Sequence, residues 1–151
     1  MVSLCLGCRY SGGDPGATGE EMIVGSGIDV VEIARIERAL ARTGGRFARR
    51  VFTPQEIAAC EARRRPALHF AVRFAAKEAA MKALGTGWSQ GVRWVDIETV
   101  PDGQRPSALL RLQLHGRGAE RAGRSGASGC HLAVSRSRTH AVAIVLLERT
   151  A

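Results

Sequence analysis

A segment rich in strong helix formers, Leu68–Leu84, places charged side chains where a helix would be apolar. Alanine, lysine, glutamate and methionine all favour helix, and the glycines that follow at 85 and 87 predict its end. At about 100° per residue, one stripe of this helix would consist of Phe70, Phe74, Met81 and Leu84. Lys77 falls within that stripe and Glu78 at its edge. Because a charge among apolar side chains needs a partner, both are expected to be paired internally or to bind a ligand.

An ordinary ion pair on the helix surface is the competing interpretation of the same segment. Glu78 and Lys82 are four residues apart and would share one face of the helix. An exposed pair of this kind contributes only about 0.3–0.5 kcal/mol to stability. The spacing alone leaves both interpretations open.

Length and composition favour a single globular domain. The chain has 151 residues, and two domains of half that size would each bury too small a core. Hydrophobic residues make up 45% and charged residues 24%, and no run of about 18 apolar residues predicts a membrane span. Residues 1–21 are rich in glycine and lack periodicity, so we expect a disordered leader before a domain over residues 22–151. Cys5 and Cys8 lack a matching second pair, which favours reduced thiols in a cytoplasmic protein over zinc or redox chemistry.

The remaining pattern predicts short helices followed by paired strands. Apolar residues at i, i+3 and i+7 from Ile33 predict a helix that ends at Gly44, after a strand over residues 22–28. A capping box beginning at Thr53 predicts the start of the next helix. Further strands are expected over residues 92–100, 107–114, 130–135 and 141–148, with a turn at 101–104 and a short helix or loop at 116–126. This order predicts an α+β fold, with a mainly antiparallel sheet packed on a long central helix.

A second candidate site begins with the small residues Gly25-Ser26-Gly27 and ends at Asp29. Small residues would let a bulky anion and its cation approach the backbone, whereas the competing interpretation is that Asp29 only caps the next helix. One carboxylate from each segment, Asp29 and Glu78, can hold a hard cation such as Mg²⁺, which keeps water and substrate phosphates as its other ligands. Phosphate oxygens would then be neutralised by Lys77, Lys82 and the Gly85-Thr86-Gly87 backbone. The two segments together are typical of phosphoryl transfer.

The charge balance favours a polyanionic partner. Lysine and arginine number 22 against 14 acidic residues, which gives a formal net charge of +8. Nucleic acid, a phosphate-rich cofactor and an acidic protein all fit this charge. Aromatic residues make up only 5%, which disfavours a stacking platform for single-stranded nucleic acid.

Several of these segments together resemble the holo-[acyl carrier protein] synthases, the small phosphopantetheinyl transferase family. The matching segments are Gly27–Ile36, Arg46-Phe47, Phe52–Glu56, Arg73–Gly87, Asp96–Glu98 and Gly103–Pro106. The resemblance covers about residues 22–149. It implies a 4′-phosphopantetheinyl transferase-like fold. It also implies Mg²⁺-dependent transfer of 4′-phosphopantetheine from coenzyme A to a serine of apo-acyl carrier protein, with release of adenosine 3′,5′-bisphosphate.

The resemblance also implies roles for individual residues. Asp29 and Glu78 would be the magnesium ligands, and Lys82 a contact to the phosphates of the coenzyme, with Lys77 assisting. The acidic carrier would dock on a basic surface that includes Arg35, Arg42 and Arg46. The family forms trimers with sites at subunit interfaces, so a homotrimer is expected. The proton of the attacking serine would go to a metal-bound water or to Glu78, and the residues do not choose between them.

One departure from the family pattern lies near the end of the penultimate strand. The family shows a histidine between two hydroxyl residues, where this chain has Ser135-Arg136-Ser137. Arg136 can hold a phosphate bidentately but does not titrate near neutral pH, so coenzyme contacts are expected at Arg136 and Ser137 with altered detail. Two alternatives stay open. One is a non-catalytic homologue that binds coenzyme A or a carrier, and the other is a basic nucleic-acid-binding module. The sequence does not indicate whether a fatty acid, polyketide or other carrier is served.

Overall fold

A computed structural model describes residues 3–4, 21–86, 91–102 and 110–150, which form two antiparallel sheets around one long helix. The larger sheet has the strand order β2 (Glu21–Glu32), β6 (His140–Thr150) and β5 (Gly129–Arg136). The smaller has the order β1 (Ser3–Leu4), β4 (Leu110–His115) and β3 (Ile97–Pro101). Every strand pairing within the described residues is antiparallel, which confirms the predicted fold class.

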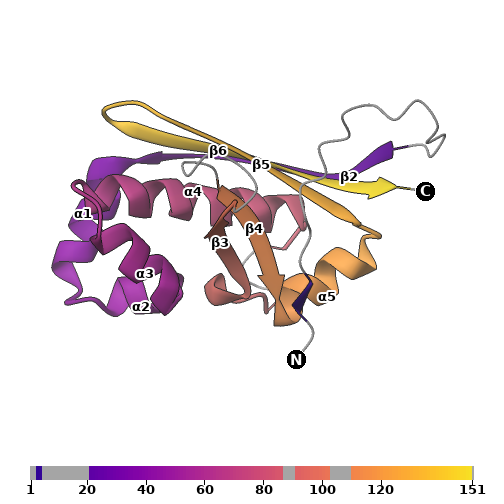
Figure 1. The fold of residues 1–151 in the computed structure, drawn as a ribbon, viewed down its shortest axis with the longest axis horizontal. Coiled ribbons are helices and arrows are strands. Elements are labelled where there is room, and N and C mark those ends of the chain that lie inside the picture. The colour runs from indigo at the N-terminus through magenta and orange to yellow at the C-terminus, as the bar shows by residue number, and fades with distance from the viewer. Residues whose placement is uncertain (1–2, 5–20, 87–90, 103–109, 151) are drawn as a thin grey trace.

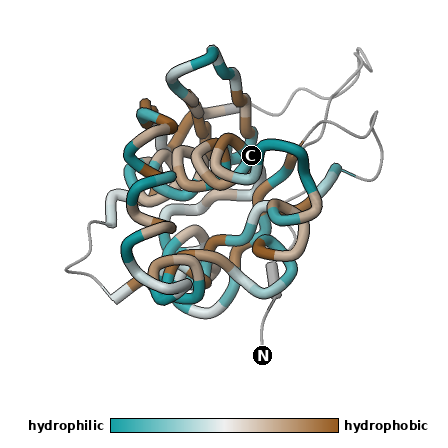
Figure 2. The backbone as a smooth tube through the Cα atoms, turned by 90° about the vertical axis from the view of Figure 1, so that its left-hand side faces the viewer, coloured by the Kyte–Doolittle hydropathy of each residue, from teal (hydrophilic) through white to brown (hydrophobic). Residues whose placement is uncertain are grey.

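The longest helix, α4 (Pro66–Ala83), runs along one face of the larger sheet (Figure 1). At one end of the molecule lie α1 (Ile33–Arg42), α2 (Arg46–Val51) and α3 (Pro54–Glu61), while α5 (Gly116–Arg124) lies at the other. A short 3-10 helix, η2 (Trp94–Asp96), leads into β3. Figure 2 shows brown and teal alternating along the helical turns, as expected of helices with one face in the core. None of the described helices is long and apolar enough to cross a membrane.

Small side chains let α4 approach β2 unusually closely. Ala75, Ala76 and Ala79 on α4 are fully buried. A Cβ atom at Gly27 would overlap the carbonyl oxygen of Ala79 and lie 2.8 Å from the backbone nitrogen of Ala83. Gly25 has the same relation to the carbonyl oxygen of Ala83. Strand and helix therefore touch backbone to backbone along this line, and the glycines are required for that contact.

Most of the predicted elements are present, with shifted boundaries. The capping box at Thr53 forms as predicted, and Pro54 occupies the first turn of α3. Gly85 ends α4 with a φ of +64°, as expected of a left-handed residue after a helix. The first long strand continues to Glu32 instead of ending at residue 28, and α2 was not expected from the pattern. The strand expected over 92–100 begins only at Ile97.

Two predictions concern parts of the chain that the structure describes incompletely. Ser3–Leu4 form β1 and pair with β4, and Glu21 opens β2, whereas the rest of the predicted leader over residues 1–21 lies outside the described residues and stays a prediction. Cys5 and Cys8 lie outside the described residues, as do 103–109, which include part of the predicted turn and returning strand. Cys60 and Cys130 are both buried. Burial raises the pKa of the Cys60 thiol, which marks it as an unreactive core residue.

Candidate active site

The close contact between β2 and α4 brings Asp29 beside Lys82. Asp29 lies on the same face of β2 as the two glycines, within the strand and not at its end. Its Oδ1 accepts a hydrogen bond of 2.8 Å from Lys82 Nζ, which also donates to the carbonyl oxygen of Ile28 at 2.8 Å. The N-cap of α1 is Glu32, so the interpretation that Asp29 merely caps that helix is wrong. Lys82 pairs with Asp29 and not, as the surface-pair interpretation required, with Glu78.

Glu78 lies one turn before Lys82 on α4, close enough to Asp29 to be affected by its charge. Burial raises the pKa of the Glu78 carboxyl, and the negative charge of Asp29 raises it further. Lys82 and Arg35 of α1 act in the opposite direction. Two carboxylates from distant segments therefore share one region, together with one lysine and one arginine.

This carboxylate pair suits a hard divalent cation. Burial and the negative charge of Asp29 together raise the pKa of Glu78 in spite of the nearby Lys82 and Arg35, and a bound cation would favour the ionised carboxylate. Carboxylate oxygens are the ligands that Mg²⁺ prefers, and one or two of them suffice when substrate phosphates and water complete the shell. Among the described residues, no group of three or more histidine, cysteine, aspartate and glutamate side chains is arranged to hold a metal ion. The site is thus a two-carboxylate arrangement on the protein side.

Lys77 lies on a different side of α4, inside the core. Its Nζ is 2.7 Å from Glu56 Oε2 and donates to the carbonyl oxygens of Trp94 at 3.1 Å and Ile97 at 2.7 Å. These contacts use all three donors of the ammonium group. Lys77 is 0% exposed and Glu56 only 1%. Of the two roles predicted for Lys77, the structure selects internal pairing, and the expected assistance to a coenzyme is corrected because no donor is left for it.

The buried pair extends into a polar network that the sequence did not reveal. Thr99 donates to Glu56 Oε1 through both its backbone nitrogen, at 2.8 Å, and its hydroxyl, at 2.6 Å. Arg73 Nη1 in turn contacts Thr99 Oγ1 at 2.6 Å and its carbonyl oxygen at 3.0 Å, while Nε lies 3.2 Å from Cys60 Sγ. The network therefore fixes the position of the Arg73 guanidinium. One sign of this network was present in the sequence: Lys77 lies in an apolar stripe of the predicted helix, where its charge needs a partner.

The backbone after α4, which was predicted to bind phosphate oxygens, is already engaged in hydrogen bonds at the end of the helix. Gly85 N donates to the Lys82 carbonyl oxygen, and Thr86 N to that of Met81, both at 3.0 Å. The Thr86 hydroxyl also faces the Met81 carbonyl oxygen, and Thr86 is 2% exposed. These groups close the helix end, so they are not free donors for a phosphate. Gly87 lies outside the described residues.

A cationic cavity lies between the start of α4 and the end of β5. Its volume is about 390 Å³. Four nitrogen-bearing side chains line it, namely Arg63, His69, Arg73 and Arg136. Apolar walls are provided by Val72, Pro101, Leu110 and Val134. We call this space the Arg136 cavity; cations beside apolar walls suit a ligand that carries both a phosphate and a flat ring.

The two predicted contacts at the end of β5 have different surroundings. Arg136 lines the cavity, as does Ser135, which was not predicted. Ser137 instead holds the turn of the β5–β6 hairpin. Its Oγ accepts from the backbone nitrogens of Thr139 and His140 at 3.1 and 3.0 Å. The expected coenzyme contact at Ser137 is therefore corrected, whereas Arg136 keeps an exposed guanidinium beside the cavity.

Comparisons with known proteins identify the family of this chain. The family model for the 4′-phosphopantetheinyl transferase superfamily matches residues 25–145. A holo-[acyl-carrier-protein] synthase from Alkalilimnicola ehrlichii is 51% identical over 128 residues, covering 84% of this chain and 98% of that protein. One from Koribacter versatilis is 46% identical over 127 residues, covering 84% of this chain and 99% of the relative.

A solved structure extends the likeness to three dimensions. The Helicobacter pylori holo-[acyl-carrier-protein] synthase in complex with coenzyme A matches with a TM-score of 0.69 at 29% identity. The match covers 81% of this chain and 98% of that one. With the family model spanning most of the described residues and curated relatives near half identical, the chain belongs to the 4′-phosphopantetheinyl transferase superfamily, among its holo-[acyl-carrier-protein] synthases.

Proposed function

We propose that this chain transfers 4′-phosphopantetheine from coenzyme A to a serine of an apo-acyl carrier protein. The observation that carries the proposal is the meeting of Asp29, Glu78 and Lys82 at the contact between β2 and α4. In the reaction, the serine hydroxyl oxygen forms a bond to the phosphorus next to pantetheine. The bond from that phosphorus to the bridging oxygen breaks, adenosine 3′,5′-bisphosphate leaves, and the hydroxyl proton passes to Glu78 or to a water molecule.

Asp29 and Glu78 would hold Mg²⁺ between them. When bound, that ion supplies charge neutralisation for the pyrophosphate oxygens. Lys82 donates two hydrogen bonds, to Asp29 and to the Ile28 carbonyl oxygen, so one N–H of its ammonium group remains for a ligand. Its side chain is 50% exposed. That donor would bind a phosphate oxygen and stabilise the charge that develops on the leaving group. Asp29 therefore has two roles, as a cation ligand and as the group that positions Lys82.

The Arg136 cavity would bind the nucleotide end of the coenzyme. Val72, Leu110 and Val134 offer apolar contact to a flat base, while the guanidinium groups of Arg73 and Arg136 suit a phosphate monoester. Arg73 is 7% exposed and anchored by Thr99, so its charge is held in place before a ligand arrives. This preorganisation favours tight binding, because little side-chain freedom is lost on association.

The position of the cavity on α4 supports a site shared between two copies of the chain. His69 and Glu78 are nine residues apart, which on a helix means about 13 Å of rise and opposite faces. One coenzyme would therefore reach the carboxylates of one protomer and the cavity of another. The outer face of the larger sheet provides an apolar surface for such an assembly. On it, Ile28, Val30 and Ile144 are 55%, 60% and 43% exposed, and Ile28 lies directly opposite Ile144. The assembly we propose is a homotrimer.

Charging this sheet face should separate the copies. The variant Val30→Lys/Ile144→Lys is expected to sediment as a monomer and to lose transferase activity, because a lysine on each neighbouring strand would be buried unpaired at the interface. A mixing experiment checks the shared site directly. Glu78→Gln and Arg136→Glu chains, each impaired alone, should regain part of the activity when they are unfolded and refolded together. A monomeric wild type, or a mixture without recovery, would contradict the shared site.

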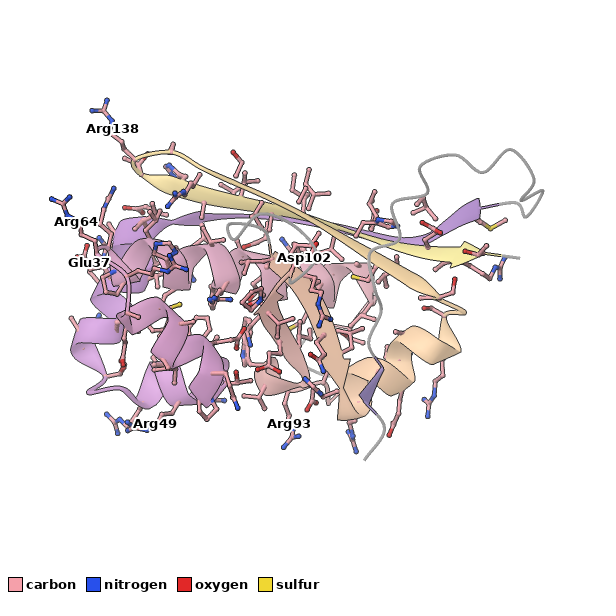
Figure 3. All side chains as sticks on the ribbon, in the orientation of Figure 1. Glu37, Arg49, Arg64, Arg93, Asp102 and Arg138 are labelled. Carbon is pink, nitrogen blue, oxygen red and sulfur yellow. The ribbon has the colours of Figure 1, made fainter. Side chains whose placement is uncertain are left out.

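The carrier protein would dock on the exposed arginines of α1 and α2. Arg35 and Arg42 are seven residues apart and share a face of α1, and Arg46 begins α2. Arg35 is also close enough to act on the pKa of Glu78, so an acidic helix bound there would lie next to the reaction centre. Other basic side chains project from different edges of the molecule, as Arg138 and Arg93 do in Figure 3. That distribution favours a compact acidic partner over nucleic acid.

Reversing one of these charges should slow association with the carrier. Arg35→Glu is expected to lower the association rate by about tenfold at low ionic strength, with a smaller difference at high salt, since the effect is electrostatic steering. Arg124→Glu on α5, at the opposite end of the molecule, is the matched control and should change the rate little. Stopped-flow or surface-binding measurements at several salt concentrations would show this. Equal effects of the two variants would exclude α1 as the docking surface.

The proposed activity itself is tested by incubating the full chain with coenzyme A, Mg²⁺ and apo-carriers from fatty acid and polyketide pathways. Intact-mass spectrometry should show a gain of one phosphopantetheine group on the carrier serine, together with release of adenosine 3′,5′-bisphosphate. Chelation of Mg²⁺ should abolish the gain. Coenzyme binding without any mass gain on any carrier would instead identify a binding homologue without turnover.

A further inference from the structure

His69 is the residue in the Arg136 cavity whose chemistry the proposed reaction has not used. It lies near the start of α4, partly buried, and lines the cavity together with Arg63, Arg73 and Arg136. Among the described residues that line this cavity, it is the only one that can change its charge near neutral pH. Arginine keeps its charge at all physiological pH values.

The charge on this imidazole is set by its surroundings. Burial lowers the pKa of His69, and the positive charges of Arg136, Arg63 and Arg73 lower it further. These charges come from three directions, namely the connection after α3, the next turn of α4 and the end of β5. All of them are guanidinium groups. In the free protein, His69 is therefore a neutral imidazole at neutral pH.

A phosphate monoester would reverse this balance. It carries between one and two negative charges near neutral pH, and three guanidinium groups attract it to the cavity. Once the phosphate is inside, its charge opposes that of the arginines and favours the protonated imidazole. A protonated His69 can donate from both ring nitrogens, and its bond to phosphate is then charge-assisted.

We propose that His69 is a further coenzyme-binding residue, which takes up a proton as the phosphate monoester of the nucleotide enters the Arg136 cavity. The proposal rests on the proposed function, because that function supplies the ligand. It adds a fourth positive charge to the site only when the ligand is present. The free cavity is thereby spared the repulsion that four permanent cations would cause.

The sign of the pH dependence follows from linkage. If ligand binding raises the pKa of His69, binding takes up protons, and affinity increases as the pH falls through the pKa of the complex. The gain is complete below the lower pKa of the free protein. Protonation of the phosphate itself, with a second pKa of about 6, works against binding at still lower pH. The contribution of His69 is therefore the difference between the wild type and a His69 variant at each pH.

The experiment is isothermal titration calorimetry of the full chain between about pH 6 and about pH 8, the range in which histidine titrates. Each titration is repeated in two buffers of different ionisation enthalpy, which gives the number of protons taken up. The ligands are coenzyme A, dephospho-coenzyme A, which lacks the 3′-phosphate, and inorganic phosphate. The proteins are the wild type, His69→Phe, His69→Gln and His140→Phe. The last is the matched control, because His140 is exposed at the start of β6, outside the cavity.

Near pH 6, the wild type and His140→Phe are expected to bind coenzyme A severalfold more tightly than the His69 variants do, and a pKa change of one unit sets an upper limit of about tenfold at lower pH. Near pH 8 this ratio should approach one. Proton uptake should be present with coenzyme A and absent with dephospho-coenzyme A. Proton uptake with inorganic phosphate would show that the phosphate group alone is sufficient.

Three results would overturn the proposal: an unchanged pH dependence in both His69 variants, equal proton uptake with dephospho-coenzyme A, or no binding of coenzyme A at all. Failure of the proposed function looks different. Proton-linked coenzyme binding that depends on His69, without transfer to any carrier, would keep this role for His69 and remove the transferase. Transfer of phosphopantetheine to a carrier, combined with coenzyme binding that takes up no proton, would keep the transferase and remove this role of His69.

Discussion

Replacing Glu78 by glutamine is expected to lower the rate of carrier modification by about a thousandfold or more while making the metal-free protein slightly more stable. The loss follows because one of two carboxylates that would hold the cation is gone, and a bound metal contributes several kcal/mol of charge stabilisation in such reactions. The gain follows from the raised pKa of Glu78, which burial and the nearby Asp29 produce. The folded protein thus disfavours the ionised form of this side chain.

The effect of Glu78→Gln on the free energy of unfolding depends on pH. A carboxyl whose pKa is raised by folding stabilises the fold below its unfolded pKa, where it is protonated in both states. That contribution is lost as the pH rises through the folded pKa. At neutral pH the ionised Glu78 therefore works against folding, and glutamine removes this cost. Because the side chain is partly exposed, we expect a melting temperature only about 1–3 °C higher.

The two effects are measured on the same samples. Activity is read as the mass gain on the carrier, and stability as thermal unfolding with and without Mg²⁺, which should stabilise the wild type but not Glu78→Gln. Glu61→Gln, at the exposed end of α3, is the matched control and should leave both quantities unchanged. Full activity in Glu78→Gln, or a clearly lower melting temperature without metal, would remove Glu78 from the proposed site.

Replacing Lys77 by methionine is expected to destabilise the fold by about 3–5 kcal/mol. This is the usual cost of removing one partner from a buried ion pair. Methionine fills a similar volume but leaves Glu56, 1% exposed, without the cation that lies 2.7 Å from it. The carbonyl oxygens of Trp94 and Ile97 also lose their shared donor. Chemical denaturation monitored by circular dichroism would measure the difference in the free energy of unfolding.

A double variant separates the pair from its surroundings. Adding Glu56→Gln to Lys77→Met should recover part of the lost stability, because the uncompensated charge is then removed, although Thr99 keeps a weaker acceptor. At temperatures where Lys77→Met remains folded, its affinity for coenzyme A should stay within a few fold of the wild type, because Thr99 still accepts from Arg73 through its carbonyl oxygen. A folded Lys77→Met with strongly weakened coenzyme binding would instead restore the role that the sequence predicted for this lysine.

The helices were the most predictable part of the fold. Capping residues and periodicity placed α3 and α4 within a few residues, because these signals act over one or two turns. Asp29 was harder to place. Gly25, Gly27 and Asp29 lie on one face of β2, and the apolar side chains of Ile28 and Val30 lie on the opposite, outer face. An apolar outer face hides the alternation that normally identifies a strand, so the strand was expected to end too early.

The sequence could predict those parts of the candidate site that depend on residues within one segment of the chain. The pairing of one carboxylate from β2 with one from α4 could be expected from residue type. The partner of Lys77 could not, because Glu56 comes from another helix and is already engaged in a local cap. The Arg136 cavity is assembled from segments more than sixty residues apart, Arg63 and Arg136 among them, and no local pattern joins these. Where the resemblance implies a histidine, this chain has Arg136. His69, from a distant segment, lines the same cavity as Arg136, and only the structure shows this.

The backbone contact between Gly27 and Ala79 means that no layer of side chains separates the strand from the helix at the site. The gap between Asp29 and Glu78 is consequently set by main-chain geometry, which side-chain repacking elsewhere in the core hardly alters. Directed evolution of this scaffold toward other carriers can therefore vary the exposed arginines of α1 and α2 without moving the two carboxylates. The two carboxylates would keep their separation, provided that both glycines stay untouched.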